Sequence, residues 1–88
     1  GDRWAVRRED GSWLLDGQIP LTDLAQHLGL EWPDADIDEG FETVSGLIHW
    51  RLGRIPRTTD SIRWQDWTFE VVDMDGQRID KVLAVRVG

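Results

Sequence analysis

The acidic run between residues 34 and 40 is the part of the sequence best suited to metal chemistry. Its carboxylates belong to Asp34, Asp36, Asp38 and Glu39. Several carboxylate oxygens together can ligate a hard cation such as Ca²⁺ or Mg²⁺. An EF-hand is excluded, because the sixth position holds Glu39 instead of glycine and the twelfth holds Ser45 instead of glutamate. Two alternatives stay open: a weak divalent-cation site, or a solvated acidic loop that favours the N-terminus of the next helix.

Residue sets for other chemistries are missing from the sequence. Cysteine is absent, and the histidines are His27 and His49. A zinc or catalytic role would require partners that the sequence does not place beside either histidine, so both are predicted to lie at the surface. The serines lack the glycines of a nucleophile elbow, and no glycine-rich phosphate loop is present. We therefore expect a protein that is not an enzyme.

Charge and hydropathy exclude two classes of partner. The formal net charge is −7, whereas binding to nucleic acid requires an excess of Lys and Arg on one face. Arg51, Arg54 and Arg57 recur at the end of a predicted helix, where cations interact favourably with the last carbonyls; the alternative is a patch for a small anion or an acidic partner. No apolar run approaches the roughly 20 residues needed to span a bilayer, so we expect no direct membrane insertion by this domain.

The longer predicted helix has both of its ends defined. It begins after Thr43, whose hydroxyl can accept a hydrogen bond from the first turn, and ends at Gly53, which suits a left-handed stop. Apolar residues recur at helical spacing between these ends. Gly46, inside the helix, is expected to allow close packing on a sheet.

The N-terminal part predicts a linker, a strand and a short helix. Residues 1–9 are polar and are interpreted as the remnant of a linker. The first strand is expected at residues 13–15, between glycines. A helix is expected over residues 21–28, with Thr22 as N-cap and Gly29 as stop.

The C-terminal part predicts an antiparallel meander. Strands are expected at residues 61–64, 67–73 and 79–87, with an Asp-Gly turn at residues 75–76. Apolar residues alternate with others from Trp67 to Val72, and one face of the last strand is expected to carry Ile79, Leu83, Val85 and Val87. The predicted fold is an α+β domain: a small, mainly antiparallel sheet with two helices packed on one face.

Six tryptophans in 88 residues exceed what a core of this size can bury completely. The predicted core tryptophans are Trp13, Trp64 and Trp67, and the predicted interface tryptophans are Trp4, Trp32 and Trp50. Trp50 lies off the apolar stripe of its helix, and exposed tryptophan is enriched at protein contacts.

Four segments together resemble the transporter-associated domain of the CorC/HlyC type. These are residues 10–17 (DGSWLLDG), 21–24 (LTDL), 43–56 (TVSGLIHWRLGRIP) and 69–82 (FEVVDMDGQRIDKV). The resemblance covers nearly the whole chain after about residue 10, so residues 10–88 are expected to form the domain. One departure is visible: Thr59 stands where the family usually has the glycine of a Gly-Asp turn. The turn is expected to survive with different backbone angles.

The resemblance implies a C-terminal accessory domain of a membrane protein. It implies partners in the same protein, namely a membrane region and a pair of CBS-type nucleotide-sensing domains, and a place on the cytoplasmic face of the membrane; a homodimer is also considered. The implied role is modulation of ion transport, usually of magnesium and cobalt, under the older name hemolysin. No catalytic residues are implied. The family's fold is similar to a subdomain of the PCMH-type FAD-binding fold, so FAD is a cofactor by analogy alone.

Overall fold

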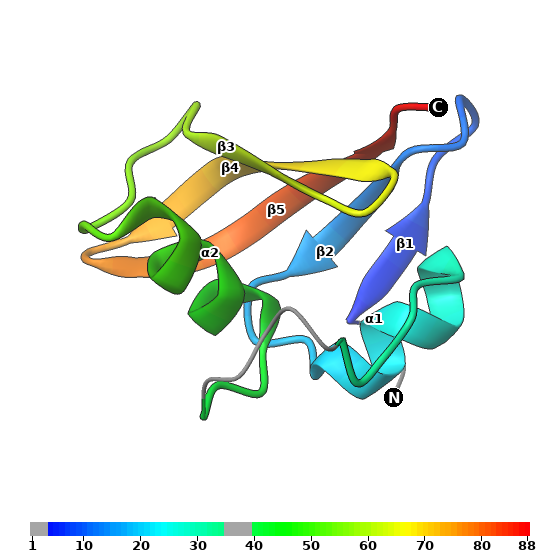
Figure 1. Cartoon of the computed structure of the whole chain (residues 1–88). Coiled ribbons are helices and arrows are strands. Elements are labelled where there is room, and N and C mark those ends of the chain that lie inside the picture. The colour runs from blue at the N-terminus through cyan, green and yellow to red at the C-terminus, as the bar shows by residue number, and fades with distance from the viewer. Residues whose placement is uncertain (1–3, 35–39) are drawn as a thin grey trace.

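A computed structural model, which describes residues 4–34 and 40–88, contains one antiparallel sheet with two helices packed on one side (Figure 1). The elements are β1 (Ala5–Arg7), β2 (Trp13–Asp16), α1 (Leu21–Leu28), α2 (Val44–Leu52), β3 (Ser61–Trp64), β4 (Trp67–Asp75) and β5 (Arg78–Arg86). The five strands are ordered β1-β2-β5-β4-β3. The predicted α+β class, with two helices on one face of the sheet, is confirmed.

Strand β1 forms the edge of the sheet within the segment that was interpreted as a linker. Ala5 pairs with Leu15 and Arg7 pairs with Trp13. The Asp16 amide also donates to the Trp4 carbonyl at 2.8 Å. The linker interpretation therefore missed this strand. A three-residue strand is too short to show a periodic pattern, and its backbone pairing with β2 is a tertiary contact.

Three of the four residues predicted to define the helix ends do so in the structure. Thr43 Oγ1 accepts a hydrogen bond from the Gly46 amide at 3.2 Å, and Gly29 and Gly53 both have φ 70°. The prediction of Thr22 as N-cap of α1 is wrong, since the capping position is Pro20, without a side-chain bond.

A backbone contact between the starts of the two helices takes the place of a side-chain cap on α1. The Leu21 amide donates to the Glu42 carbonyl at 2.8 Å, and the Val44 amide donates to the Ile19 carbonyl at 3.1 Å. Because these partners are about 20 residues apart in sequence, local patterns give no signal for them.

The absence of a side chain at Gly46 leaves room for Phe41, and it is not needed for packing against the sheet. A Cβ atom at this position would lie 2.6 Å from the Phe41 Cβ. The expected packing of Gly46 on the sheet is therefore wrong, because the close neighbour is the chain that leads into α2.

The core lies between the helices and the inner face of the sheet. Its helix residues are Leu21, Leu24, Leu28, Val44, Leu47 and Ile48, and its main strand residues are Leu15, Phe69, Val71, Ile79, Val82 and Ala84. All but Leu21 and Leu28 of these have no exposed surface. The predicted alternation along β4 is confirmed, because Trp67, Phe69 and Val71 are buried.

The prediction for the faces of β5 is wrong. Ile79 is buried with Val82 and Ala84, while Val85 is exposed on the opposite face. Two register shifts between β4 and β5 near Asp73 change the alternation along the strand. Simple period-two counting therefore groups Ile79 with residues of the wrong face.

Candidate functional site

Asp34, the first predicted metal ligand, is held by hydrogen bonds from β3 and the residue after it. Its Oδ2 accepts from Trp64 Nε1 at 2.7 Å and from Gln65 Nε2 at 3.2 Å. The other predicted ligands, Asp36, Asp38 and Glu39, lie outside the described residues. Over residues 4–34 and 40–88, no group of three or more His, Cys, Asp or Glu side chains is placed to hold a metal. The divalent-cation site stays a prediction.

The tryptophans divide between the core and its margin. Trp64 and Trp67 are buried, as predicted. Trp32 is half-buried and packs edge-on against Trp64, with ring centroids 6.2 Å apart. Trp4 and Trp13 are also half-buried against the core. Two of the predicted interface tryptophans, Trp4 and Trp32, thus have part of their surface occupied by intramolecular packing.

Trp50 is the predicted interface tryptophan with the largest exposed surface. Its side chain is 38% exposed, and its ring lies 5.6 Å from the Phe41 ring and 6.0 Å from the Arg51 guanidinium. These contacts cover part of the ring, and the rest of its surface is accessible. An interface role for Trp50 stays a prediction.

A row of apolar side chains on the outer face of the sheet was not identified from the sequence. Val6, Leu14 and Leu83 are direct neighbours across β1, β2 and β5. Val85 lies two residues further along β5 and is 40% exposed, while Val6 and Leu14 are 57% and 36% exposed. We call these four residues the outer row. The available signal was the continuous apolar run of residues 82–85, which is typical of a strand with apolar contacts on both faces.

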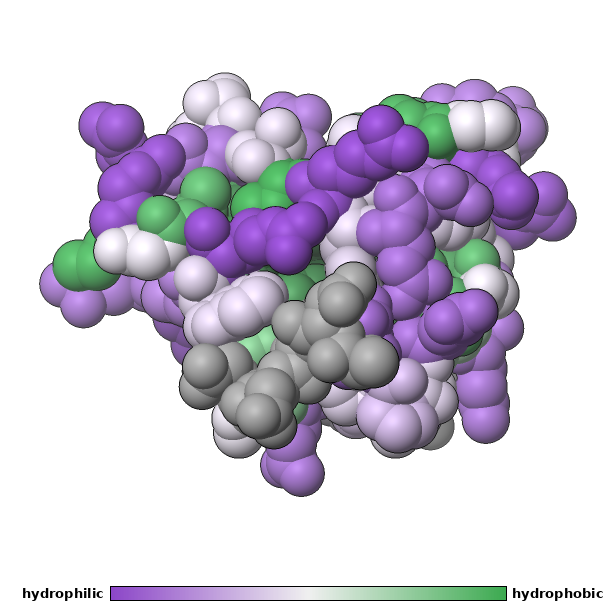
Figure 2. Space-filling view, in the orientation of Figure 1, coloured by the Kyte–Doolittle hydropathy of each residue, from purple (hydrophilic) through white to green (hydrophobic). Residues whose placement is uncertain are grey.

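The outer row joins apolar side chains of three neighbouring strands. On the face drawn in Figure 2, hydrophilic residues cover most of the surface, and hydrophobic residues form separate patches. Scattered apolar residues are normal on a protein surface, whereas contiguous ones indicate contact sites. The register therefore identifies the outer row as the stronger candidate for a docking surface.

The arginines after α2 make intramolecular contacts. Arg54 Nη1 and Nη2 donate to Asp60 Oδ2 and Oδ1 at 2.8 and 2.9 Å. These bonds, together with one from the Arg57 amide, lower the pKa of Asp60 to about 2. Arg51 donates to the Arg63 carbonyl at 2.8 Å. The guanidinium of Arg54 is thus satisfied internally, which weakens the alternative of an anion patch at this helix end.

The turn that contains Thr59 has the conformation of a glycine turn. Thr59 has φ 77°, and its amide donates to the Val71 carbonyl at 2.8 Å. That φ lies in the region that glycine adopts readily, and the expectation that the backbone angles differ from those of the family's turn stays a prediction. The tertiary hydrogen bond holds threonine in a region that L-residues rarely adopt.

The two histidines have different surroundings. His49 Nδ1 is 2.8 Å from the Ser45 carbonyl one turn earlier in α2, and His27 is exposed beside Trp13. The Ser45 hydroxyl oxygen lies 3.5 Å from the same His49 Nδ1. Among the described residues, no helix is long and apolar enough to cross a membrane.

Comparison with known sequences gives a consistent set of relatives. Residues 6–88 match the CorC_HlyC transporter associated domain. The polyamine export protein of Escherichia coli K12 is 39% identical over 83 residues, which are 93% of this chain and 18% of that protein. A UPF0053 protein of Synechocystis is 40% identical over 79 residues, 90% of this chain and 18% of the relative. The chain therefore spans about a fifth of the length of these relatives.

Solved structures share the fold over the whole domain. The transporter associated domain of a Xylella fastidiosa hemolysin, in complex with Mg²⁺ and Mn²⁺, is 39% identical with a TM-score of 0.83, covering 97% of this chain and 99% of that one. The corresponding domain from Nitrosomonas europaea is 29% identical with a TM-score of 0.85, covering 99% and 100%. A domain from a CBS domain protein of Porphyromonas gingivalis has the same fold at 23% identity, with a TM-score of 0.81 and coverage of 97% and 99%.

Proposed function

Since the chain belongs to the CorC/HlyC family of transporter associated domains, we propose that it is a non-catalytic accessory domain of a membrane transporter. Its role is to modulate cation transport, of the magnesium and cobalt type, by contacting other domains of the same protein on the cytoplasmic face of the membrane. The much greater length of the relatives supports this proposal, because they contain further regions for such a domain to contact. The E. coli relative is named for the export of polyamines, which are also cations.

The observation that carries this proposal is the outer row. Four apolar side chains lie together on a sheet face, and three of them are at least 36% exposed. Burying them against a partner would contribute roughly 25 cal/mol for each Å² of apolar surface. The partner that we propose is the CBS-type domain pair of the same protein. A second copy of this domain is the competing occupant.

The test is to charge the outer row in the complete transporter. We expect Leu14→Lys combined with Val85→Lys to change cation efflux from cells, while the melting temperature of the 88-residue domain changes little. Ile55→Lys is the matched control, because Ile55 is 54% exposed but lies between α2 and β3. Unchanged efflux in the double variant, or an equal change in the control, would overturn the proposal.

Light scattering on the 88-residue chain distinguishes the two occupants. A monomeric mass supports docking onto the rest of the transporter. A dimeric mass that Leu14→Lys and Val85→Lys reduce to that of a monomer would assign the outer row to self-association instead.

A divalent-cation sensor is the second candidate. It is supported by the Xylella fastidiosa relative in complex with Mg²⁺ and Mn²⁺ and by the acidic composition of residues 34–39. Calorimetric titration with Ca²⁺ and with Mg²⁺ should then give saturable heat that is lost when Asp36 and Asp38 are both changed to Asn. If neither the titration with Ca²⁺ nor the titration with Mg²⁺ gives saturable heat, this candidate is contradicted.

A further inference from the structure

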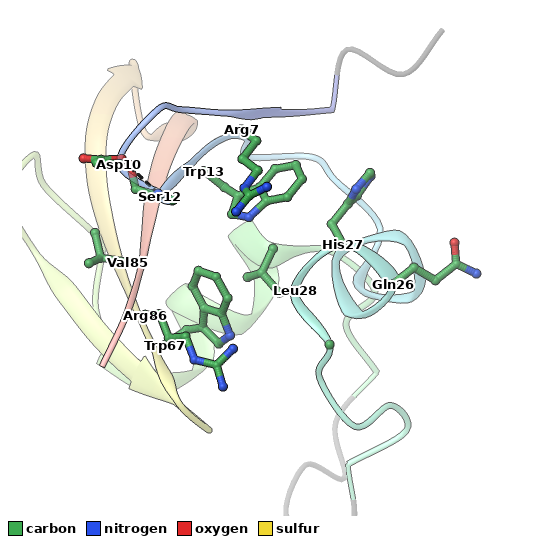
Figure 3. A pocket seen from close by; sticks show the side chains of 12 residues that line it. Arg7, Asp10, Ser12, Trp13, Gln26, His27, Leu28, Trp67, Val85 and Arg86 are labelled. Atoms are coloured by element: carbon green, nitrogen blue, oxygen red, sulfur yellow. Dashed lines mark hydrogen bonds between the residues drawn. The ribbon is translucent and has the colours of Figure 1, made fainter. Parts of the chain in front are cut away.

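A cavity of about 660 Å³ opens between the C-terminal end of α1 and the neighbouring end of the sheet (Figure 3). Its walls come from the β1–β2 turn, α1 and the ends of β4 and β5. The volume lies within the range of roughly 300–1,000 Å³ that small-molecule sites occupy. Neither Asp34 nor Trp50 is among the described residues that line this cavity.

Aromatic side chains form two parts of the wall. The half-buried Trp13 packs on His27, with ring centroids 5.1 Å apart and an interplanar angle of 46°. The buried Trp67 lies further along the wall, beside Leu28 (Figure 3). These rings offer a surface on which a flat group can stack.

Two arginines bring positive charge to a protein whose net charge is −7. Arg7 and Arg86 both line the cavity, and in the described part of the chain neither guanidinium belongs to an ion pair. Arg86 lies 6.0 Å from the centre of the Trp67 ring. A guanidinium can bind a carboxylate or a phosphate through two parallel hydrogen bonds.

Among the described residues that line the cavity, Asp10 carries the one carboxylate, and hydrogen bonds within its own turn hold it. Asp10 Oδ1 accepts from Ser12 Oγ at 2.6 Å and from the Ser12 amide at 2.9 Å. These bonds lower the pKa of Asp10, so this side chain carries a negative charge at neutral pH. With two arginines, Arg7 and Arg86, against this one carboxylate, the described lining still has a net positive charge.

We propose that this cavity binds a small anion that carries a flat ring. The ring stacks on Trp13, and the anionic group pairs with Arg7, the cross-strand neighbour of Trp13. Arg86, beside Trp67, adds positive charge at the other end of the cavity (Figure 3). Two sources share this chemistry, a nucleoside monophosphate and an aromatic carboxylate. The site goes beyond the docking role of the outer row, with which it shares Val85, and the proposed contacts to Trp13 and Arg7 do not involve that residue.

Calorimetric titration of the 88-residue chain tests the proposal with four probes: AMP, indole-3-acetate, adenosine and inorganic phosphate. We expect saturable binding of AMP or of indole-3-acetate, and whichever binds more tightly identifies the source. Adenosine and inorganic phosphate, which each carry only one of the two groups, should bind at least about tenfold more weakly.

Substitutions of lining residues test whether the heat measured by calorimetry comes from binding in the cavity. Arg7→Gln should weaken binding about tenfold, and Arg86→Gln should weaken it less, whereas Arg57→Gln, the same change on the exposed turn after α2, should have no effect. Circular dichroism checks that every variant is folded. No saturable binding of either ring-bearing anion, equal binding of phosphate alone, or equal loss in Arg57→Gln would each overturn the proposal.

Discussion

The two faces of the sheet carry similar apolar side chains but differ in what covers them. Leu15 and Phe69 on the inner face have no exposed surface, while Leu14 and Val85 on the outer face are 36% and 40% exposed. Leu14 and Leu15 are neighbours in the chain and point to opposite faces. Residue type alone therefore does not separate side chains that stabilise the fold from side chains available for contact; the covering layer of helices does.

The largest expected effect comes from removing the centre of the inner face. Phe69→Ala should lower the free energy of unfolding by about 3–5 kcal/mol, because it deletes a fully buried ring. If that variant does not fold, Phe69→Leu should still show a loss of about 1 kcal/mol. Urea denaturation of the 88-residue chain measures both.

The control for this prediction lies on the outer face. Val85→Thr keeps the β-branched shape at an exposed position and should change stability by no more than about 0.5 kcal/mol. A loss as large as that of Phe69→Leu would show that the outer face contributes to folding as the inner face does, and the contrast between the faces would fail.

The next effect concerns the point where β2 ends beside β5. A Cβ atom on Gly17 would lie 2.2 Å from the Ile79 carbonyl oxygen, and the Gly17 amide donates to the Asp80 carbonyl at 2.9 Å. Gly17→Ala must displace backbone and should cost about 3 kcal/mol in urea denaturation. Gly40→Ala, where a Cβ would meet no atom of the described residues within 4 Å apart from its chain neighbours, should be nearly neutral; equal losses would contradict the close contact.

A smaller effect, an increase in stability instead of a loss, is expected at the exposed turn before β3. Thr59 is held at φ 77°, a conformation that costs an L-residue roughly 1–2 kcal/mol. Thr59→Gly should relieve this strain and raise the melting temperature, with a net gain of about 0.5–1 kcal/mol after the added flexibility of the unfolded chain. Thr58→Gly, at the preceding position, should instead destabilise the domain.

The smallest effect is a pH dependence of stability that comes from Asp60, next to Thr59 in the same turn. The pKa of Asp60 is lowered from 3.8 to about 2 by Arg54 and by the Arg57 amide. Its stabilising contribution is therefore present above the unfolded pKa and is lost as the pH falls from about 4 towards 2. Arg54→Gln should raise the pKa of Asp60 in an NMR titration, whereas Arg78→Gln should leave it unchanged. An unshifted pKa in Arg54→Gln would contradict the ion pair.

Local signals predicted most of the elements but only part of the candidate sites. Thr43, Gly29 and Gly53 define helix ends through bonds and angles within a few residues, so short-range patterns were sufficient. Thr22 failed as a cap because backbone groups about 20 residues away bind the start of α1. The outer row was missed because its residues come from three strands and become neighbours only through the register.

The sequence by itself determined the α+β class, both ends of α2 and the C-terminal end of α1, the alternation of β4 and the resemblance to the family. These features depend on hydrogen bonds and periodicities that span a few residues. Tertiary structure alone decided the pairing of β1, the register shifts that divide β5 between two faces, and the cavity that Arg7 and Arg86 both line. Each of these joins residues far apart in the chain, and their contacts form only when the sheet closes over its helices.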